Sequence, residues 1–451
     1  MRSCIKITRR GLLRRLPLAA APCFVPSVAF AGRGAAPSSR INLGIIGLKK
    51  MGGEHVRQLL GFPEVQIRAV CDVRRDLRLE QQALVNQRYA ERRRDGTYED
   101  CAAYNEYEHV LERDDIDAVV IAVPDHWHAL IAIAACRAGK DVYCEKPLSR
   151  TLGEARDMVA AARRYGTVFQ TGSQQRSGPE FRRACELVRN GYIGQVRRVR
   201  VEVGPASTAV YLPAEAVPPG FDYDRWLGPA PWAPFNALRV GSYYFDGWRR
   251  IRDYSGGKMT DWGAHHFDIV QWGLGMDGAG PQEIIPPAGR QVDQPMPKII
   301  EGTGASPADP SWGLRYVYPG GVEVLKDGDN GVRFEGDEGV VQVNRGLLRT
   351  EPASLLEQRL RPGDLRLYRS PGHYQDWFEC MRTRRRPICD VEIGARSATV
   401  CHLGNLAFWL KRPIRWDAGA QRIVGDEQAA RWIDQPMRGA YSAPETIAST
   451  T

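Results

Sequence analysis

The chain has 451 residues, too many for one small hydrophobic core and enough for two domains. It carries 62 basic against 53 acidic residues, a net charge of +9, and six of the basic residues but no acid fall within positions 1–31. Without those six the charge is +3, so the remainder gives no reason to expect a nucleic-acid partner.

The first 31 residues have the pattern of an export signal. Arg9 and Arg10 form a twin-arginine pair, and an apolar region over 16–30 ends on small residues. Prolines interrupt this region, which is too short to span a bilayer. We therefore predict a removable twin-arginine signal peptide over 1–31, export of the folded protein to the periplasm and no membrane anchor. The alternative is a fortuitously basic N-terminus.

A linker rich in glycine, alanine, proline and serine is expected over 32–39, and a dinucleotide-binding pattern follows it. Residues 41–46 read as a strand, 47–52 as a turn, 53–60 as a helix and 65–70 as a second strand. Gly47 and Gly52 occupy the places of the first and third glycines of a G-x-G-x-x-G turn, where a helix N-terminus would hold a pyrophosphate. Lys49 replaces the second glycine, where backbone and phosphate come closest.

Asp72 follows the second strand, 25 residues after Gly47, at the position that binds the ribose hydroxyls. A carboxylate there favours NAD, because it repels the extra phosphate of NADP, but Arg74 and Arg75 keep NADP possible. A βαβ turn that binds no cofactor remains the structural alternative.

Further strands alternate with helices along the chain. We expect helices over 76–94, 104–111 and 130–138, and strands over 118–123 and from Val142, which is typical of a parallel doubly wound sheet. The segments 124–128 and 145–147 should then lie at the same sheet edge as the glycine turn. Lys146 becomes the first candidate for chemistry, with a surface lysine that ends an ordinary strand as the alternative.

The eight cysteines beyond the leader, such as Cys71, Cys136 and Cys144, lie in or beside apolar runs and are expected to be buried core thiols. Their spacing supports neither a disulfide framework nor a metal site, so no metal is predicted.

Four motifs together resemble the Gfo/Idh/MocA oxidoreductase family: Pro-Asp-His-Trp-His at 124–128, Ala-Gly-Lys at 138–140, Cys-Glu-Lys-Pro at 144–147 and the glycine-rich segment 256–268. The likeness covers residues 41 to about 416. It implies an α/β chain with an N-terminal Rossmann domain (40–170) and a C-terminal α+β domain (171–420) built on a large, open, mostly antiparallel sheet. It also implies a carbohydrate substrate and a homo-oligomer, a dimer or tetramer. Residues 421–451 are expected to form a tail.

The resemblance also suggests which residues act on the substrate. It places Lys146, Asp261 and His265 at the reacting hydroxyl. His265 suits a general acid/base, and Lys146 can stabilise alkoxide character. Asp261 and His265 are four residues apart, so on one helix the acid should orient the imidazole. Taken alone, His265 would read as a satisfied core histidine. His266 should be structural, Pro147 should hold the peptide of Lys146 in a cis bond, and His373 is a possible late member of the pocket.

The same pattern and resemblance give the expected cofactor site. Its residues are Gly47, Lys49, Met51, Gly52, Asp72, Pro124, His128 and Glu145. His128 has a helix-start hydrogen bond as its plain alternative, and Glu145 has a structural role in fixing its loop. Aromatic residues of the irregular region 204–255, among them Trp226 and Trp248, suit either a sugar ring or anchoring of the loop.

We expect an NAD(P)-dependent oxidoreductase acting on a hydroxyl carbon of a sugar, glycoside or polyol. One alternative is a glycoside hydrolase or lyase that oxidises its substrate transiently and retains its cofactor. The other is a sugar-binding homologue without catalysis, which only Lys49 favours.

Overall fold

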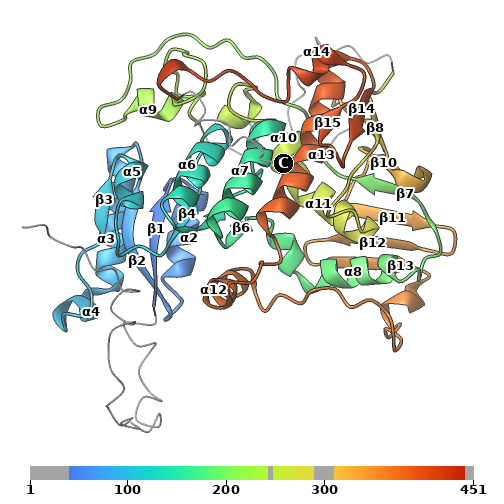
Figure 1. Cartoon of the computed structure of the whole chain (residues 1–451), viewed down its shortest axis with the longest axis horizontal. Helices are drawn as coiled ribbons and strands as arrows, with labels where there is room; N and C mark the ends of the chain where they lie inside the picture. The colour runs from blue at the N-terminus through green and yellow to red at the C-terminus, as the bar shows by residue number, and fades with distance from the viewer. Residues whose placement is uncertain (1–39, 242–246, 289–308, 442–451) are drawn as a thin grey trace, which may run out of the picture.

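The computed structural model describes residues 40–241, 247–288 and 309–441, which form two domains joined side by side (Figure 1). The expected signal peptide and linker lie outside the described residues, as do Tyr243 and Tyr244 of the irregular region. Within the described part, no helix combines the length and apolarity that crossing a bilayer requires.

The first domain is a doubly wound parallel sheet, as expected. Its six strands pair in the order β3-β2-β1-β4-β5-β6, and every pairing is parallel. The strands are β1 Ile41–Ile46, β2 Val65–Cys71, β3 Ala102–Tyr104, β4 Ala118–Ile121, β5 Asp141–Cys144 and β6 Phe169–Thr171. The central strands are buried along their whole length because helices cover both faces.

Helices from both halves of the chain cover this sheet. On one face α2 (Met51–Leu59), α3 (Arg75–Arg88) and α12 (His373–Thr383) share an apolar core with β1 and β2. On the other face α5 (Tyr107–Leu111), α6 (Asp125–Arg137) and α7 (Leu152–Tyr165) pack together with the start of α13 (Val391–Leu410). Two of the helices that cover the first sheet, α12 and α13, therefore lie more than 200 residues after its last strand.

Some element boundaries differ from the sequence prediction. The helix α2 begins at Met51 rather than at 53, and α6 begins at Asp125 rather than at 130, so both helices start directly at the sheet edge. The charged helix expected over 76–94 breaks at Tyr89, whose buried ring packs on Tyr98, and continues as α4 (Ala90–Arg94). The stretch expected as one helix over 104–111 is the end of strand β3 followed by α5. A three-residue edge strand is too short to show periodicity.

The second domain is built on a nine-stranded sheet with the order β13-β12-β11-β7-β10-β9-β8-β14-β15. Only β10 and β7 pair in parallel, so the sheet is mostly antiparallel, as the family resemblance implied. The strands are β7 Val196–Val201, β8 Glu283–Ile285, β9 Arg315–Val317, β10 Glu323–Leu325, β11 Val332–Gly336, β12 Val340–Asn344, β13 Leu347–Glu351, β14 Ile414–Asp417 and β15 Arg422–Ile423. The last strand extends the sheet past residue 420, into the segment expected to be a tail.

Helices cover one face of this sheet. α8 (Pro179–Arg189), α11 (Gly263–Leu274) and α13 bury their apolar residues against it in the largest hydrophobic core of the molecule. The opposite face carries partly exposed charged side chains, where Arg198 and Arg200 lie against Glu335. The eight cysteines among the described residues are all buried, as predicted for core thiols.

A long segment between the two sheets reaches back over the first domain. We call residues 204–241 the strap; it contains α9 (Tyr223–Leu227), which lies beyond α5 and α6 at the top of Figure 1. The Arg75 N–H donates to Gly220 O at 2.9 Å, and Arg225 forms ion pairs with Glu106 and Glu108 at 3.1 and 3.0 Å.

A second segment, late in the chain, fastens the strap from outside. The side chain of Arg438 donates to the carbonyl oxygens of Gly228 and Asp224 at 3.0 and 2.9 Å. Tyr441 packs edge-on against Trp127 of α6, with ring centroids 5.3 Å apart. The strap is therefore held between the parallel-sheet domain and the C-terminal segment.

Candidate functional site

A cavity of about 540 Å³ opens at the carboxyl edge of the parallel sheet. The ends of β1, β2, β4 and β5 form one side, and the strap, the segment 248–249 and α11 form the other. This is the crevice where doubly wound sheets bind ligands. It brings together nearly all of the residues that the sequence singled out.

The two glycines of the turn are required by close packing. Gly47 has φ +85°, and a Cβ there would lie 2.5 Å from Ala122 O. A Cβ on Gly52 would lie 1.7 Å from Gly47 O, so only glycine lets α2 start against the turn. Gly47 lines the cavity, whereas Gly52 lies behind the lining and shapes it. Met51 lines the cavity at the first residue of α2.

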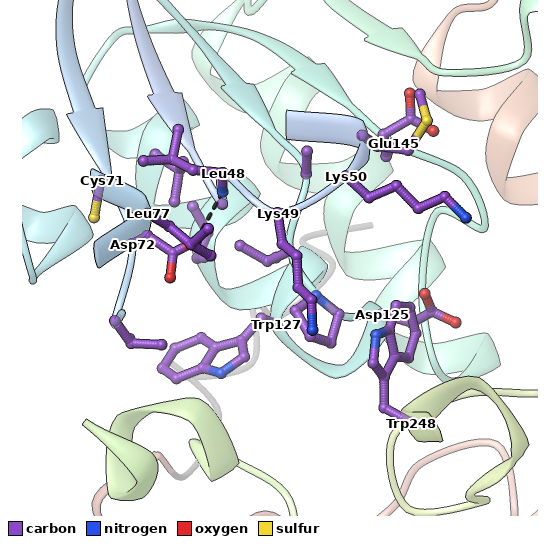
Figure 2. A pocket seen from close by; sticks show the side chains of 18 of the residues that line it. Leu48, Lys49, Lys50, Cys71, Asp72, Leu77, Asp125, Trp127, Glu145 and Trp248 are labelled. Carbon is purple, nitrogen blue, oxygen red and sulfur yellow. Dashed lines mark hydrogen bonds between the residues drawn. The ribbon is translucent and has the colours of Figure 1, made fainter. Parts of the chain in front are cut away.

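Lys49, in place of the second glycine, also lines the cavity. Figure 2 shows its side chain reaching from the turn into the pocket, and its ammonium donates to Val240 O of the strap at 3.3 Å. The side chain thus crosses the pocket rather than filling the turn itself. Burial, followed by repulsion from Arg74, lowers the pKa of Lys49.

Asp72 connects the end of β2 to the glycine turn. Its Oδ2 accepts from Leu48 N–H at 2.8 Å (Figure 2), and its Oδ1 accepts from Arg74 N–H, also at 2.8 Å. Burial raises the pKa of Asp72, against the effect of these two hydrogen bonds. The carboxylate faces the cavity at the position where a ribose would be bound. The turn, the α2 N-terminus and Asp72 therefore fit a dinucleotide.

The structure does not bring His128 to this cavity. Its ring is buried, with Nδ1 2.8 Å from Pro147 O and Nε2 3.0 Å from Val123 O, so it connects α6 to neighbouring loops. Pro124 does line the cavity, and so does Asp125, the first residue of α6. Burial raises the pKa of Asp125 to about 7.

Lys146 follows β5 and reaches the second domain. Its Nζ donates to Asp261 Oδ1 at 2.7 Å and to Asp261 O at 3.0 Å. Lys258 Nζ donates to the other carboxylate oxygen, also at 2.7 Å. Although burial opposes it, Lys146, Arg249 and Lys258 together hold the pKa of Asp261 well below its usual range. Asp261 is thus ionised and fixes the ammonium of Lys146 in the cavity.

The expected pairing of Asp261 with His265 on one helix face is not present. The helix breaks at Trp262 into α10 (Lys258–Asp261) and α11, because the His265 N–H bonds to Trp262 O while Asp261 O accepts from Lys146. Within the described residues, His265 Nδ1 has no hydrogen-bond partner. Burial, then the charges of Lys146 and Arg345, hold the pKa of His265 well below its usual value. The imidazole is therefore neutral and faces the cavity near Lys146.

Glu145 serves the loop that carries Lys146, as its structural alternative suggested. Its buried Oε1 lies 3.0 Å from His55 Nε2 and accepts from Gln174 at 3.1 Å, and its Oε2 accepts from the Lys146 N–H at 3.3 Å. Burial raises its pKa, but the hydrogen bond with His55 and nearby positive charges lower it overall. The peptide bond that follows Lys146 is cis, as expected for Pro147.

Several residues in the cavity wall or behind it were missed or left undecided by the sequence. His55 and Gln174, which contact the Glu145 carboxylate, belong to no motif that the sequence analysis used. His266 is structural as expected, with Nδ1 2.5 Å from Glu202 O, and His373 lines the cavity. The strap and the segment after it contribute Phe221, Arg225, Trp226, Val240, Trp248 and Arg249.

Comparison with known proteins agrees with this architecture. An oxidoreductase-family model for an NAD-binding Rossmann fold matches residues 41–173, and the model for the family's C-terminal alpha/beta domain matches 206–443. A myo-inositol 2-dehydrogenase of Thermotoga maritima is 28% identical over 42% of this chain and 49% of its own. A glycosyl hydrolase family 109 protein of Solibacter usitatus is 31% identical over 34% and 36%.

Among solved structures, an aldose-aldose oxidoreductase of Caulobacter crescentus, complexed with glycerol, aligns with a TM-score of 0.55. It is 18% identical and covers 83% of this chain and 99% of its own. This likeness shows the fold. The chain spans about half the length of the first curated relatives it matches.

Proposed function

The chain belongs to the Gfo/Idh/MocA oxidoreductase family, with its NAD-binding Rossmann domain, and from this premise we propose that it transfers hydride between a nicotinamide cofactor and a hydroxyl carbon of a carbohydrate. The substrate class is a sugar, glycoside or polyol. One observation carries the proposal: Lys146 and the neutral His265 face the same cavity as the glycine turn and Asp72.

The residues divide the reaction between them. When bound, the nicotinamide cofactor supplies a hydride acceptor or donor. His265, neutral and buried, takes the hydroxyl proton, because a base must be unprotonated to act. Lys146, fixed by Asp261, stabilises the negative charge that develops on the oxygen. Glu145 and the segment that it fixes keep Lys146 in place.

The cofactor end is formed by the turn and the strap. Gly47 and Met51 line the position of the pyrophosphate, and Lys49 reaches across it to the strap. Asp72 faces the ribose and favours NAD over NADP. Phe221 and Trp226 close the cavity from the strap side. The described residues thus fit a dinucleotide enclosed between the two domains.

The first experiment is to denature the purified mature protein and identify any nucleotide that it releases. Release of NAD or NADH near one per chain, followed by net reduction of added NAD with a sugar from a panel, is the expected result. A protein that carries no nucleotide and binds none when it is added would refute hydride transfer. It would leave a sugar-binding homologue as the function.

A second candidate has the relative named as a glycosyl hydrolase in its favour. In that reaction a sugar carbon is oxidised by hydride transfer, the aglycone leaves by elimination, water adds to the double bond that is left, and the hydride is returned to the oxidised carbon. Cleavage of chromogenic glycosides by the nucleotide-loaded protein, without net NADH, would establish this candidate over the dehydrogenase.

We also propose that the chain is exported to the periplasm by the twin-arginine route, because of the pattern at Arg9 and Arg10. Replacing both arginines by lysine should leave the full-length protein in the cytoplasm. Periplasmic recovery of this variant would contradict the proposal.

We further propose a homo-oligomer, a dimer or tetramer, formed through the charged face of the nine-stranded sheet. Light scattering during gel filtration measures its mass directly. A monomer at micromolar concentration would contradict this proposal.

A further inference from the structure

One end of the cavity, which we call the reacting end, surrounds Lys146 and His265. The described residues that line it include the cations Lys50, Arg249 and Arg345 besides Lys146. The lining acids there are Asp261, Glu145, whose buried carboxylate His55 holds, and Asp125, whose pKa burial raises to about 7. Among the described residues, positive charge therefore exceeds negative charge where the substrate must lie.

Asp261 does not balance this charge. Its two carboxylate oxygens already accept from Lys146 and Lys258, each at 2.7 Å. The Nε of Arg249 lies 3.6 Å from Asp261 Oδ1, which is too long for a hydrogen bond. One carboxylate thus faces three cations, and Arg249 is the one that it holds least closely.

Arg249 is oriented by stacking rather than by hydrogen bonds. Its guanidinium carbon lies 4.2 Å from the ring centroid of Trp248, and its side chain is 20% exposed. The structure gives Arg249 no hydrogen bond to another described residue. A guanidinium that is stacked and partly desolvated presents a planar set of donors to a carboxylate or phosphate.

Arg345 adds a second cation from another direction. It lies in the turn between β12 and β13, exposed at the mouth of the cavity, and stacks over Trp262 at 5.0 Å. Its charge reaches His265, whose pKa it helps to lower after burial and Lys146. An anion entering the cavity would therefore pass one arginine and end beside another.

The cofactor does not account for Arg249. Its pyrophosphate belongs at the glycine turn, where Lys49 and the α2 N-terminus lie. After burial, the charge of Arg249 helps to lower the pKa of Lys49 at that turn. The guanidinium itself, however, lies beside Asp261, the residue that holds Lys146. We propose that the substrate carries an oxyanion, either a carboxylate or a phosphate, and that Arg249 binds this group beside the reacting carbon. The proposal rests on the proposed function and specifies its substrate class as acidic carbohydrates.

The test compares neutral and acidic forms of the same sugar. Calorimetric titration of the NAD-loaded protein with glucose, glucuronate and glucose phosphate, and with the galactose set, gives the affinity ratio of each acid to its neutral parent. We expect a ratio of about tenfold or more, because a charge-assisted pair is worth at least that much. The uronate and phosphate titrations show which oxyanion is preferred, and the ratio should fall as salt is added.

Two variants locate the effect. Arg249→Gln should bring the ratio to about one while nucleotide affinity stays that of the wild type. Arg94→Gln is the matched control, because this arginine on α4 is 77% exposed and does not line the cavity, so the ratio should persist.

The proposal is overturned if no acid binds better than its parent, including the case in which no sugar binds. It is also overturned if Arg249→Gln keeps the ratio, or if this variant loses nucleotide affinity instead. A wild-type protein that does not bind NAD would refute the proposed function, and this result is distinct from a loss of preference for acidic sugars.

Discussion

Replacing Lys146 by methionine tests the centre of the proposed reaction. The change removes an ammonium that donates to Asp261 Oδ1 and Asp261 O at 2.7 and 3.0 Å and keeps an apolar chain of similar length. Loss of one donor at a developing oxyanion costs roughly 2.7–4 kcal/mol, or about 10²–10³-fold in kcat. Asp261 keeps its bond to Lys258, so unfolding should become easier by only about 1–3 kcal/mol.

The same change should move the pH profile. After burial, the charge of Lys146 is the next cause that lowers the pKa of His265, so removing it raises that pKa. A base acts only above its pKa, and the acid limb of kcat/KM should therefore shift to higher pH. The assay follows nicotinamide absorbance with the sugar that the wild type oxidises fastest, at a series of pH values.

Lys258→Met provides the matched control. Both lysines donate to Asp261 at 2.7 Å, but only Lys146 lines the cavity. Lys258→Met should lower kcat far less than Lys146→Met does. The reasoning fails if Lys146→Met stays within about tenfold of wild type, or if the two variants lose the same amount of activity.

Three further predictions concern the cofactor end and the strap. Gly52→Ala should lower the unfolding temperature and abolish NAD binding in a thermal-shift assay, because the new Cβ would lie 1.7 Å from a carbonyl oxygen, whereas Gly278→Ala, with open space around it, should change neither. Burial raises the folded-state pKa of Asp125 from 3.8 to about 7, so its stabilisation is present below about pH 4 and lost as pH rises through about 7. The free energy of unfolding of wild type, measured in urea, should fall by roughly 4 kcal/mol at most over this pH range, whereas that of Asp125→Asn should not show this fall. An equal pH dependence of the free energy of unfolding in wild type and Asp125→Asn would contradict the prediction. Arg225→Gln should speed NAD release roughly two- to fivefold in stopped-flow fluorescence, since it removes two partly exposed ion pairs, and Arg197→Gln, on the distant sheet, should not.

The sequence predicts the first domain well because its signals are local. The apolar strands, the glycines of the turn and the acid after β2 each follow from spacing within a few residues, and Gly47, Asp72 and Lys146 do lie along one cavity. The family motif identified His265 as a site residue, whereas a single histidine without that motif would have been read as part of the core. Local pattern and edge position together were sufficient here.

The remaining errors come from contacts between distant segments. The expected pair of Asp261 and His265 does not form. Lys146, 115 residues before Asp261, donates to the Asp261 carbonyl oxygen, which would otherwise accept from the His265 N–H in a continuous helix. His128 turns away because two loop carbonyls hold its ring. Arg249 lies in a 3₁₀ helix, Gly247–Arg250, that is too short to show periodicity, so only the folded chain shows that it reaches the cavity. Sequence spacing carries no information on such pairings.

The fastening of the strap by Arg438 is one of the last contacts that the growing chain can form, because its two ends lie far apart in the sequence. The strands and the glycine turn of the first domain leave the ribosome before the strap, and Arg438 emerges 210 residues after Gly228, to which it donates. Because α12 belongs to the core behind the glycine turn, the nucleotide wall is complete only late in synthesis, shortly before the fastening segment follows. In the completed chain a cofactor must pass the strap, which Arg438 holds from outside.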